Sequence, residues 1–476
     1  MENGQTMYPS SDTGLREVRL WQALVTVLFM VAAMLLGVIA LGAEPQIPLV
    51  LGCVMAALMA MLSGYRWETI LESMIEGITQ SLEAVLILLL IGMLVGVWIA
   101  CGTVPTMIYY GLKLISANIF PLATVLLCTL IAFAIGAWGT VGTIGIAFMG
   151  IGTALDFPPA LTAGCVISGA YLGEIISPLS DATNLAAAVV GENVFDAVKK
   201  VLAPAITVLV IACVFYLVTG LRHASAEPAE AMANVDSLRQ ALSETIRIHP
   251  VTLVPLLLMV VSILIKIPAI PAMLIGILSG AIVAVLTQKT GISVLLECVY
   301  SGYVCSGSNE TVNTLLTAGG MMSMMNTISV IIIAMAFGGI MQKTGQMEAL
   351  VGPIVRRIRS KGGLKALSVI VCLLMNALMA DQYLGISVPG QMFSESYRER
   401  GLSQTELAAV LLGGGATTSP LIPWNTCGMY VTGLLGVGTL SYLPYAFIPL
   451  AMPIATILFG FIAFRPKQIP ASEVSD

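Results

Sequence analysis

The chain has 476 residues, of which 58% are hydrophobic and only 10% charged, and its formal net charge is −5. A soluble domain carries about 25% charged residues, so this composition excludes an ordinary soluble protein and indicates a chain embedded in lipid. No basic stripe suggests nucleic acid as a partner. The nine cysteines form no CxxC or Cys/His cluster that would indicate a metal or disulfide framework.

The first 19 residues are polar, and the apolar run that follows them is too long for a cleaved signal peptide. We therefore interpret that run as a retained first span. A helix needs about 20 apolar residues to cross the hydrocarbon core of a bilayer. By this criterion full spans are predicted at 20–42, 46–64, 83–101, 196–221, 248–265, 269–287, 323–342 and 443–464.

Four further apolar stretches are interrupted. The stretches 119–155 and 366–396 carry polar or glycine residues at their centres, which favours re-entrant hairpins. The stretches 160–192 and 405–436 are too long for one straight span, and each contains a polar segment with proline. Irregular backbone at membrane depth is tolerated only where it lines a cavity or is buried in protein, so both are predicted to be broken helices around a functional site.

This layout occurs twice along the chain. Four landmarks of the first half recur about 242 residues later. They pair Ser177–Pro178–Leu179 with Ser419–Pro420–Leu421, Asn184 with Asn425 after one deletion, Gly139 with Asp381, and Gly102 with Gly345. The predicted fold is therefore an all-α polytopic membrane protein with two repeats of about five spans, each containing a re-entrant hairpin and a broken helix.

Five crossings per repeat require that the second repeat be inverted. With the N-terminus in the cytoplasm, 16 of the 21 basic residues fall inside, as the positive-inside rule favours. The chain is thus predicted to lie in a bacterial inner membrane with both termini cytoplasmic. The predicted boundaries are a cytoplasmic tail 1–19, a first repeat 20–221, an outer-side linker 222–247 containing a surface helix, a second repeat 248–464 and a cytoplasmic tail 465–476.

Three acids are predicted at membrane depth, where a charge is costly and marks function: Glu174, Asp181 and Asp381. Asp181 stands among the oxygen-bearing side chains of Ser180, Thr183 and Asn184. A hard cation such as Na⁺ prefers oxygen ligands, and the end of a half-helix can supply further carbonyls. The same segment could also serve as a polar helix cap, and both roles are compatible.

The second break has hydroxyls and an amide but no acid. Ser419, Asn425 and Thr426 could provide neutral ligands or hold polar groups of a substrate. The nearby run Gly413–Gly415 lacks the rest of a phosphate-binding loop and favours close helix packing. Only two histidines occur and no HExxH motif, so a membrane enzyme is disfavoured and no cofactor is expected.

Burial disfavours the charged form of a carboxyl. Such a group can hold either a proton or a sodium ion but not both. If the carrier crosses the membrane only when it is loaded, this competition alone produces exchange of protons for cations.

The segments SPLSDATNLA, WGTVGTIGIAFMGIG, DQYLGISVPGQMF and SPLIPWNTCG resemble the NhaC family of Na⁺/H⁺ antiporters. The resemblance implies inverted repeats, paired hairpins, an elevator-type movement and a homodimer. By position it implies a cation site at Asp181, Ser180, Thr183 and Asn184. Facing that site it implies a lining from Asp381, Thr140, Thr143, Ser419 and Asn425. Ser177 and Thr426 are also predicted to line the substrate site.

One feature departs from the family pattern. Where the family has Gly-Asp-Lys before the SPLSD segment, this chain has Gly173-Glu174-Ile175. The family includes members that exchange malate for lactate and others associated with amino acids. Na⁺/H⁺ antiport is therefore the first hypothesis, and Na⁺-coupled transport of a small organic acid or amino acid is the alternative.

Overall fold

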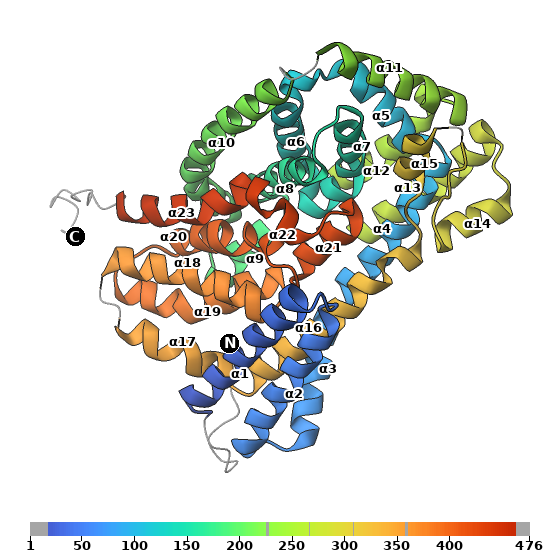
Figure 1. Ribbon diagram of the computed structural model, residues 1–476. Helices are drawn as coiled ribbons and strands as arrows, with labels where there is room; N and C mark the ends of the chain where they lie inside the picture. Colours follow the sequence, from blue (N-terminus) through green and yellow to red (C-terminus); the bar gives the residue numbers. More distant parts are fainter. Residues whose placement is uncertain (1–17, 225–227, 266, 308, 358–359, 463–476) are drawn as a thin grey trace. The chain divides into compact units, whose positions relative to one another are not determined.

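The computed structural model describes residues 18–224, 228–265, 267–307, 309–357 and 360–462 (Figure 1). The described residues are almost wholly helical, and their only extended pairing is an isolated antiparallel bridge between Tyr303 and Ala318. The chain forms two compact units, one of Met1–Leu82 with Ser329–Arg357 and one of Glu83–Ile328 with Ile358–Asp476.

The α-helices are α1 Leu20–Met34, α2 Gln46–Leu62, α3 Trp67–Gln80, α4 Leu82–Ala100, α5 Thr103–Leu114, α6 Phe120–Thr140, α7 Ile146–Ala154, α8 Pro159–Ile176, α9 Asp181–Val190, α10 Val194–Ala224, α11 Pro228–Thr245, α12 Val254–Leu264, α13 Ala269–Val283, α14 Ile292–Tyr300, α15 Glu310–Leu316, α16 Met325–Lys343, α17 Gln346–Arg357, α18 Lys361–Leu378, α19 Gln382–Glu399, α20 Gln404–Val410, α21 Thr426–Leu435, α22 Thr439–Tyr442 and α23 Phe447–Ile462.

Eight helical segments of the described chain are long and apolar enough to cross a membrane, and up to eleven if each bent pair of helices counts as one span. Five of the eight predicted full spans coincide with single helices of this kind. The prediction at 46–64 corresponds to α2, a shorter apolar helix of 17 residues, and those at 248–265 and 443–464 qualify only as parts of helix pairs bent by 87° and 61°. Several shorter helices were not predicted, because they are amphipathic or short and their apolar residues do not form long runs. These are α3, α5, α14, α15, α17 and α22.

The smaller unit consists of α1, α2 and α3 with most of α16 and all of α17. Glycines bring α3 and α16 into backbone contact, because a Cβ on Gly77 would meet the Met335 carbonyl and one on Gly339 would meet the Ser73 carbonyl. Small residues permit such close approach where lipid provides no hydrophobic drive for helix association. Hydrogen bonds of one buried side chain also connect three helices of this unit.

That side chain belongs to Gln346 at the start of α17. Its side chain accepts a hydrogen bond from Thr26 of α1 at 2.7 Å and donates to the Ala56 carbonyl of α2 at 3.1 Å. The preceding Gly345 has φ +73°, which allows α16 and α17 to join at a sharp corner.

In the larger unit, α4 and α5 pack with α12, α13 and α14 in a related way. Gly102 (φ +86°) forms the corner between α4 and α5, and Thr106 shares a 2.7 Å hydrogen bond with Thr252 just before α12. A Cβ on Gly96 of α4 would meet the Cys298 carbonyl of α14. Thus α4 contacts α14 through glycine as α16 contacts α3.

The first interrupted stretch folds back on itself. Gly136 has φ 76° and ψ 172°, a backbone conformation that interrupts α6, and the chain then returns through α7. The ring of Phe120 at the beginning lies 5.0 Å from the ring of Phe157 at the end. A continuous helix of this length would separate these residues by more than 50 Å, at about 1.5 Å per residue. The stretch is therefore a hairpin, as predicted.

The second interrupted stretch is also a hairpin, formed by the neighbouring helices α18 and α19 (Figure 1). Its turn contains Ala380 with φ 54°, and Asp381 caps the returning helix. The hydroxyl of Tyr397 near the end of α19 donates to Ser368 in α18 at 3.3 Å, which confirms that the two arms run antiparallel.

Both overlong stretches are broken where their proline-containing segments predict. Residues 177–180 separate α8 from α9, and in the second stretch α20 continues through a π-helical turn, Leu411–Ala416, before a 45° bend leads to α21. The N-caps are Ser180 and Asn425. Asn184 lies one turn inside α9, so the correspondence of Asn184 with Asn425 is wrong, because the second break holds additional residues before its cap.

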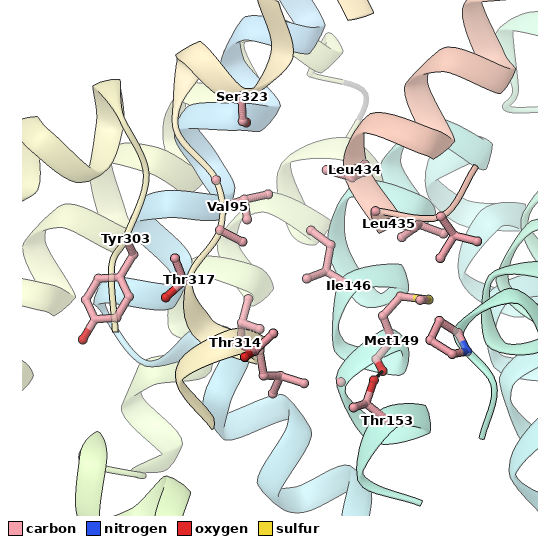
Figure 2. A pocket seen from close by; sticks show the side chains of 18 of the residues that line it. Val95, Ile146, Met149, Thr153, Tyr303, Thr314, Thr317, Ser323, Leu434 and Leu435 are labelled. Carbon is pink, nitrogen blue, oxygen red and sulfur yellow. Dashed lines mark hydrogen bonds between the residues drawn. The ribbon is translucent and has the colours of Figure 1, made fainter. Parts of the chain in front are cut away.

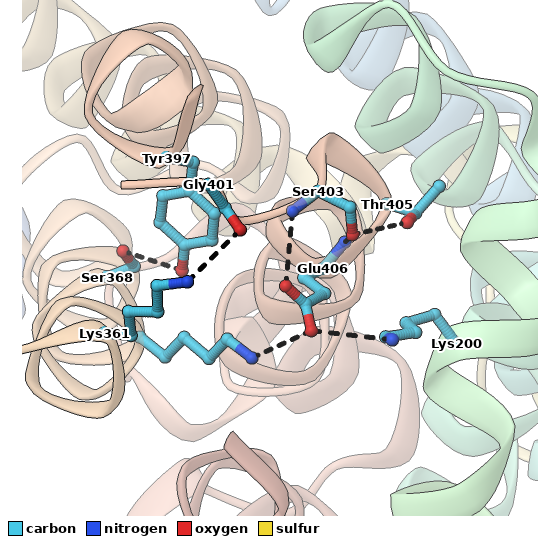
Figure 3. Close-up of polar contacts among 9 residues, drawn as sticks. Lys200, Lys361, Ser368, Tyr397, Gly401, Ser403, Thr405 and Glu406 are labelled. Carbon is cyan, nitrogen blue, oxygen red and sulfur yellow. Dashed lines mark hydrogen bonds and ion pairs between the residues drawn. The ribbon is translucent and has the colours of Figure 1, made fainter. Parts of the chain in front are cut away.

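One end of the broken helix α20 is tied to its neighbours by charge (Figure 3). Glu406, in the first turn of α20, lies 3.1 Å from Lys365 of α18 and 3.5 Å from Lys200 of α10. The Lys365 side chain is 5% exposed, so this pair is well shielded from solvent. Glu406 also accepts from the backbone of Ser403 and completes a capping box.

Candidate ion-binding site

The candidate site lies in the larger unit, where the end of α8, the turn of the second hairpin and the start of α21 meet. Glu174 in the last turn of α8 is 6% exposed. Its Oε2 accepts a hydrogen bond from the Gln382 amide of α19 at 2.8 Å, and the Cys427 thiol of α21 donates to the Gln382 Oε1 at 3.3 Å. This chain of contacts joins a side chain of the first half to two of the second.

Asp381 is also buried, and both of its carboxylate oxygens accept hydrogen bonds. Oδ1 accepts from the backbone amides of Tyr383 and Leu384 at 2.9 and 3.1 Å, as an N-cap residue does. Oδ2 accepts from the Thr426 hydroxyl at 3.1 Å. The Thr426 amide in turn donates to the Ala380 carbonyl at 2.7 Å, so the hairpin turn and the start of α21 hold each other in place.

The second break is built from neutral groups that bond one another, although the buried Asn376 Oδ1 finds no hydrogen-bond partner among the described residues. The Asn425 amide donates to the Asn376 carbonyl at 3.0 Å. The Asn376 amide donates to the Gly415 carbonyl at 2.6 Å and to the Thr418 hydroxyl at 2.9 Å. Ser419 donates to the Ala416 carbonyl at 2.9 Å. These side chains are buried, and most of their hydrogen-bonding capacity is used within the protein.

The first break is held by Ser177 and by the start of α9. The Ser177 hydroxyl donates to the Phe133 carbonyl of α6 at 2.5 Å, and Ser180 accepts from the Thr183 amide at 3.4 Å. The Thr183 hydroxyl donates to the main-chain carbonyl of Glu174 at 3.0 Å. The Asn184 amide turns back to the Ser180 carbonyl at 2.8 Å.

Asp181 differs from the other two acids because its side chain is exposed. It makes no hydrogen bond or ion pair within the described parts of the chain. Glu83 at the start of α4 is near enough for its charge to interact with that of Asp181. The Tyr383 hydroxyl lies within electrostatic reach of Asp181, Glu174 and Asp381.

The predicted lining residues of the first hairpin bond to their own backbone. Thr140 donates to the Gly136 carbonyl at 2.8 Å and Thr143 to the Gly139 carbonyl at 2.7 Å. Their hydroxyl protons are therefore committed to the hairpin, and only their oxygen lone pairs are available to a ligand.

Aromatic side chains close one side of the acid cluster. Trp138 of the first hairpin and Tyr430 of α21 stack with ring centroids 4.4 Å apart, and the Tyr430 hydroxyl donates to the Trp138 carbonyl at 2.6 Å. Trp138 and Tyr171 both lie beside the Cys427 thiol. The Trp138 Nε1 and the Tyr171 hydroxyl are buried and find no hydrogen-bond partner among the described residues. Buried donors normally have partners, so these two are candidates for contact with a ligand or water.

The structure thus brings Glu174, Asp381 and Thr426 together with Ser419, and it places Asp181 and Asn184 on the exposed side of α9. Sequence reasoning did not identify Gln382, Cys427, Tyr171 or Glu83 as site residues. Gln382 had one signal, its position next to Asp381. The others stand in apolar stretches or at the end of a span, where nothing local distinguishes them from packing or surface residues.

The chain matches the Na⁺/H⁺ antiporter family over residues 16–221 and 169–464. It is 34% identical over 435 residues to the Na⁺/H⁺ antiporter NhaC of Alkalihalophilus pseudofirmus, which covers 91% of this chain and 93% of that protein. It is 33% identical over 456 residues to the arginine/ornithine antiporter ArcD of Halobacterium salinarum, covering 94% of each.

A third relative is the malate-2H⁺/Na⁺-lactate antiporter of Bacillus subtilis. It is 34% identical over 417 residues, covering 87% of this chain and 89% of the relative. The matches extend across both interrupted stretches and both breaks that form the candidate site. The chain therefore belongs to the Na⁺/H⁺ antiporter family.

Proposed function

We propose that this protein is a secondary active transporter that exchanges Na⁺ for H⁺ across a bacterial inner membrane. The observation that carries the proposal is the enclosed Glu174 carboxyl, joined to the second half of the chain through Gln382, in a protein whose relatives include Na⁺/H⁺ antiporters. The family consists of transporters rather than enzymes, and in this proposal Na⁺ and H⁺ are cargo rather than cofactors.

In the proposed mechanism Na⁺ binds first at Asp181, with oxygens from Ser180 and Asn184 at the start of α9. The side chain of Asp181 is exposed and therefore accessible to an ion arriving from water. Glu174 and Asp381 hold protons or the cation alternately, because a buried carboxyl is favoured when its charge is neutralised. Binding of Na⁺ would release a proton from this cluster, and reprotonation on the other side would release Na⁺.

The same proposal includes two inverted repeats. The reciprocal glycine contacts of α4 with α14 and of α16 with α3 support it, as do the glycine corners at Gly102 and Gly345. Each half also contains a hairpin and a broken helix, which we take to be re-entrant and intramembrane respectively. We further propose a homodimer, on the resemblance to the family alone.

The positions of the basic residues support cytoplasmic termini. Helix α10 has 31 residues, which corresponds to about 46 Å, enough to cross the membrane. Lys200 at its start lies by Glu406 and Lys365, whereas Arg222 is in its last turn. The predicted inner and outer basic groups of this unit therefore fall at opposite ends of one spanning helix.

A second candidate function is Na⁺-coupled transport of a small carboxylate or amino acid. The Trp138 Nε1 and Tyr171 hydroxyl favour it, because these buried donors have only the weakly accepting Cys427 sulfur beside them and suit the oxygens of an organic anion better than they suit a cation. Two relatives with similar identity are named as exchangers of organic substrates. In this case Glu174 would neutralise the coupling ion or an ammonium group.

The two candidates are separated by flux measurements on the purified protein in proteoliposomes. We expect a Na⁺ pulse to change the lumenal pH, and we expect Asp181→Asn to abolish this response. Glu68→Gln, which removes an exposed acid of the smaller unit, is the matched control and should respond like the wild type. If Na⁺ moves no protons while labelled malate, lactate or an amino acid accumulates only with Na⁺, the antiporter proposal is wrong.

The proposed topology has its own test. Cysteines placed at Lys361 and Arg239 should react with an impermeant reagent from opposite sides of the membrane. Reaction of both from the same side would exclude inverted repeats.

A further inference from the structure

A large cleft opens into the larger unit on the other side of the aromatic pair from the acids. Its volume is about 920 Å³. Figure 2 shows its two walls, with Thr314, Thr317 and Tyr303 on one side and Ile146 and Met149 on the other. A bulk water molecule takes up about 30 Å³, so the cleft has room for a chain of waters and not merely for a bare ion.

One wall is a connection that only the second half possesses. In the first half α3 ends at Gln80 and α4 begins at Leu82, whereas in the second half residues 301–324 separate α14 from α16. Hydrogen bonds hold the described residues of this segment. Asn313 bonds both the amide and the carbonyl of Gly307, at 2.6 and 2.8 Å, and the Gly320 amide donates to the Gly92 carbonyl of α4 at 2.7 Å.

The face that this segment turns to the cleft combines apolar residues such as Val304 and Leu315 with several polar side chains. In α15 the exposed residues Glu310, Thr311 and Thr314 line the cleft, whereas Val312 and Leu316 are buried. Among the lining residues of the described chain, Glu310 is the only Asp, Glu, Lys or Arg. Irregular backbone beside apolar helices is tolerated where it borders water, and a single negative charge attracts cations.

Two helices lead from this cleft to the acid cluster. On α21, Cys427 contacts Gln382, Tyr430 follows three residues later on the same face, and Leu434 lines the cleft. On the return arm of the first hairpin, Trp138 stacks on Tyr430 and Ile146 lines the cleft. The stacked rings therefore stand between the cleft and the thiol that contacts Gln382.

The stacked rings leave no room for water between them, because their centroids lie 4.4 Å apart. The Tyr430 hydroxyl is also closely packed: it donates to the Trp138 carbonyl, and a Cβ on Gly142 would lie 2.8 Å from its oxygen. We propose that the cleft is the aqueous route by which a hydrated cation approaches the acid cluster from one side of the membrane, and that the Trp138–Tyr430 pair is the barrier which closes this route. The cation part of this inference rests on the proposed function.

The route can be tested with thiol chemistry that does not depend on transport. Thr314→Cys should react with a positively charged, impermeant methanethiosulfonate, and the modified protein should lose Na⁺-driven proton flux. Ile282→Cys is the matched control, because Ile282 is 61% exposed on α13 and does not line the cleft. If both cysteines are modified equally slowly, the cleft is not an aqueous route.

The barrier can be tested with Cys427, a buried native thiol on its far side. Trp138→Ala should make Cys427 reactive to the same reagent, as measured by mass spectrometry of its peptide, whereas Trp138→Phe should keep it protected. Tyr430→Ala provides the same test should Trp138→Ala fail to fold. A folded alanine variant whose Cys427 stays unreactive overturns the barrier.

The contribution of charge is tested with Glu310→Gln. A single charge such as that of Glu310 attracts a cation about 10 Å away in a water-like dielectric strongly enough to change its affinity about twofold. Loss of the Glu310 charge should therefore raise the KM for Na⁺ by about twofold and leave kcat unchanged. Salt at 1 M should remove the difference. An unchanged KM at low salt overturns the attraction of cations. If Thr314→Cys is accessible but the wild-type protein shows no Na⁺/H⁺ exchange, the proposed function is refuted and the route remains.

Discussion

The two broken helices have similar architectures and different chemistry. In both, a half-helix begins at a side-chain cap, Ser180 in the first and Asn425 in the second. The residue after the cap is an exposed Asp181 in the first and a buried Thr426 in the second, where its hydroxyl donates to Asp381. The residue after the cap therefore exposes a charge in the first break, whereas in the second break it holds the turn of the second hairpin in place.

The two breaks therefore differ in what their polar groups are free to do. Most polar groups of the second break form hydrogen bonds within the protein, and these bonds make the break a rigid support for the turn at Asp381. The first leaves Asp181 and Asn184 exposed and holds Glu174 by a single side-chain hydrogen bond. Substitutions in the first break should therefore alter transport, and those in the second should alter stability.

A loss of transport as large as that expected for Asp181→Asn is expected for Glu174→Gln. Glutamine can still bond Gln382, so the fold should persist, but an amide cannot release a proton. Na⁺-driven proton flux in proteoliposomes should fall by roughly 100-fold, the scale of losing a group that transfers a proton. Glu68→Gln again serves as the control, and exchange at the wild-type rate in Glu174→Gln would contradict the role of this carboxyl.

Removal of the amide of Asn376 should mainly reduce stability. Asn376→Ala removes the buried amide that donates to the Gly415 carbonyl and to the Thr418 hydroxyl, at a cost of about 1 kcal/mol for each lost hydrogen bond. The midpoint of thermal unfolding in detergent should therefore fall. Asn184→Ala changes an exposed amide and should have little effect on that midpoint. Equal destabilisation by the two would show that the second break is no more rigid than the first.

Asp381 combines both roles, and two variants separate them. Asp381→Ala removes the cap of α19 and should cost about 1 kcal/mol, whereas Asp381→Asn retains a good N-cap and should be close to the wild type in thermal stability. Transport should be lost in both, because neither side chain carries a charge. A stable, fully active Asp381→Asn would reduce Asp381 to a structural cap.

The smallest effect is expected for Glu83→Gln. Its charge interacts with Asp181 from the start of α4, and an interaction over about 10 Å in a water-like dielectric alters affinity by about twofold. The KM for Na⁺ should rise slightly at low ionic strength and return to the wild-type value in salt. A large loss of kcat would instead place Glu83 among the ion ligands.

The sequence determined the helical class, the positions of the spans, both hairpins and both breaks, because each depends on the local alternation of apolar runs with glycine, proline and polar residues. It also identified Glu174, Asp181 and Asp381, since an acid within an apolar stretch is visible from its neighbours alone. The pairing of Asn184 with Asn425 was wrong because an alignment of identical residues does not show at which residue a helix begins.

Only the tertiary structure decided which of these acids is enclosed. Glu174 is buried and Asp181, seven residues later, is exposed, because α8 and α9 pack differently against other helices. Such packing cannot be predicted from the neighbouring residues in the sequence. The contact of Glu174 with Gln382 joins residues 208 apart in the chain, and that of Trp138 with Tyr430 joins residues 292 apart. The segment Gly173–Ala186 thus indicated a broken helix on its own, but its partners come from the other half of the molecule.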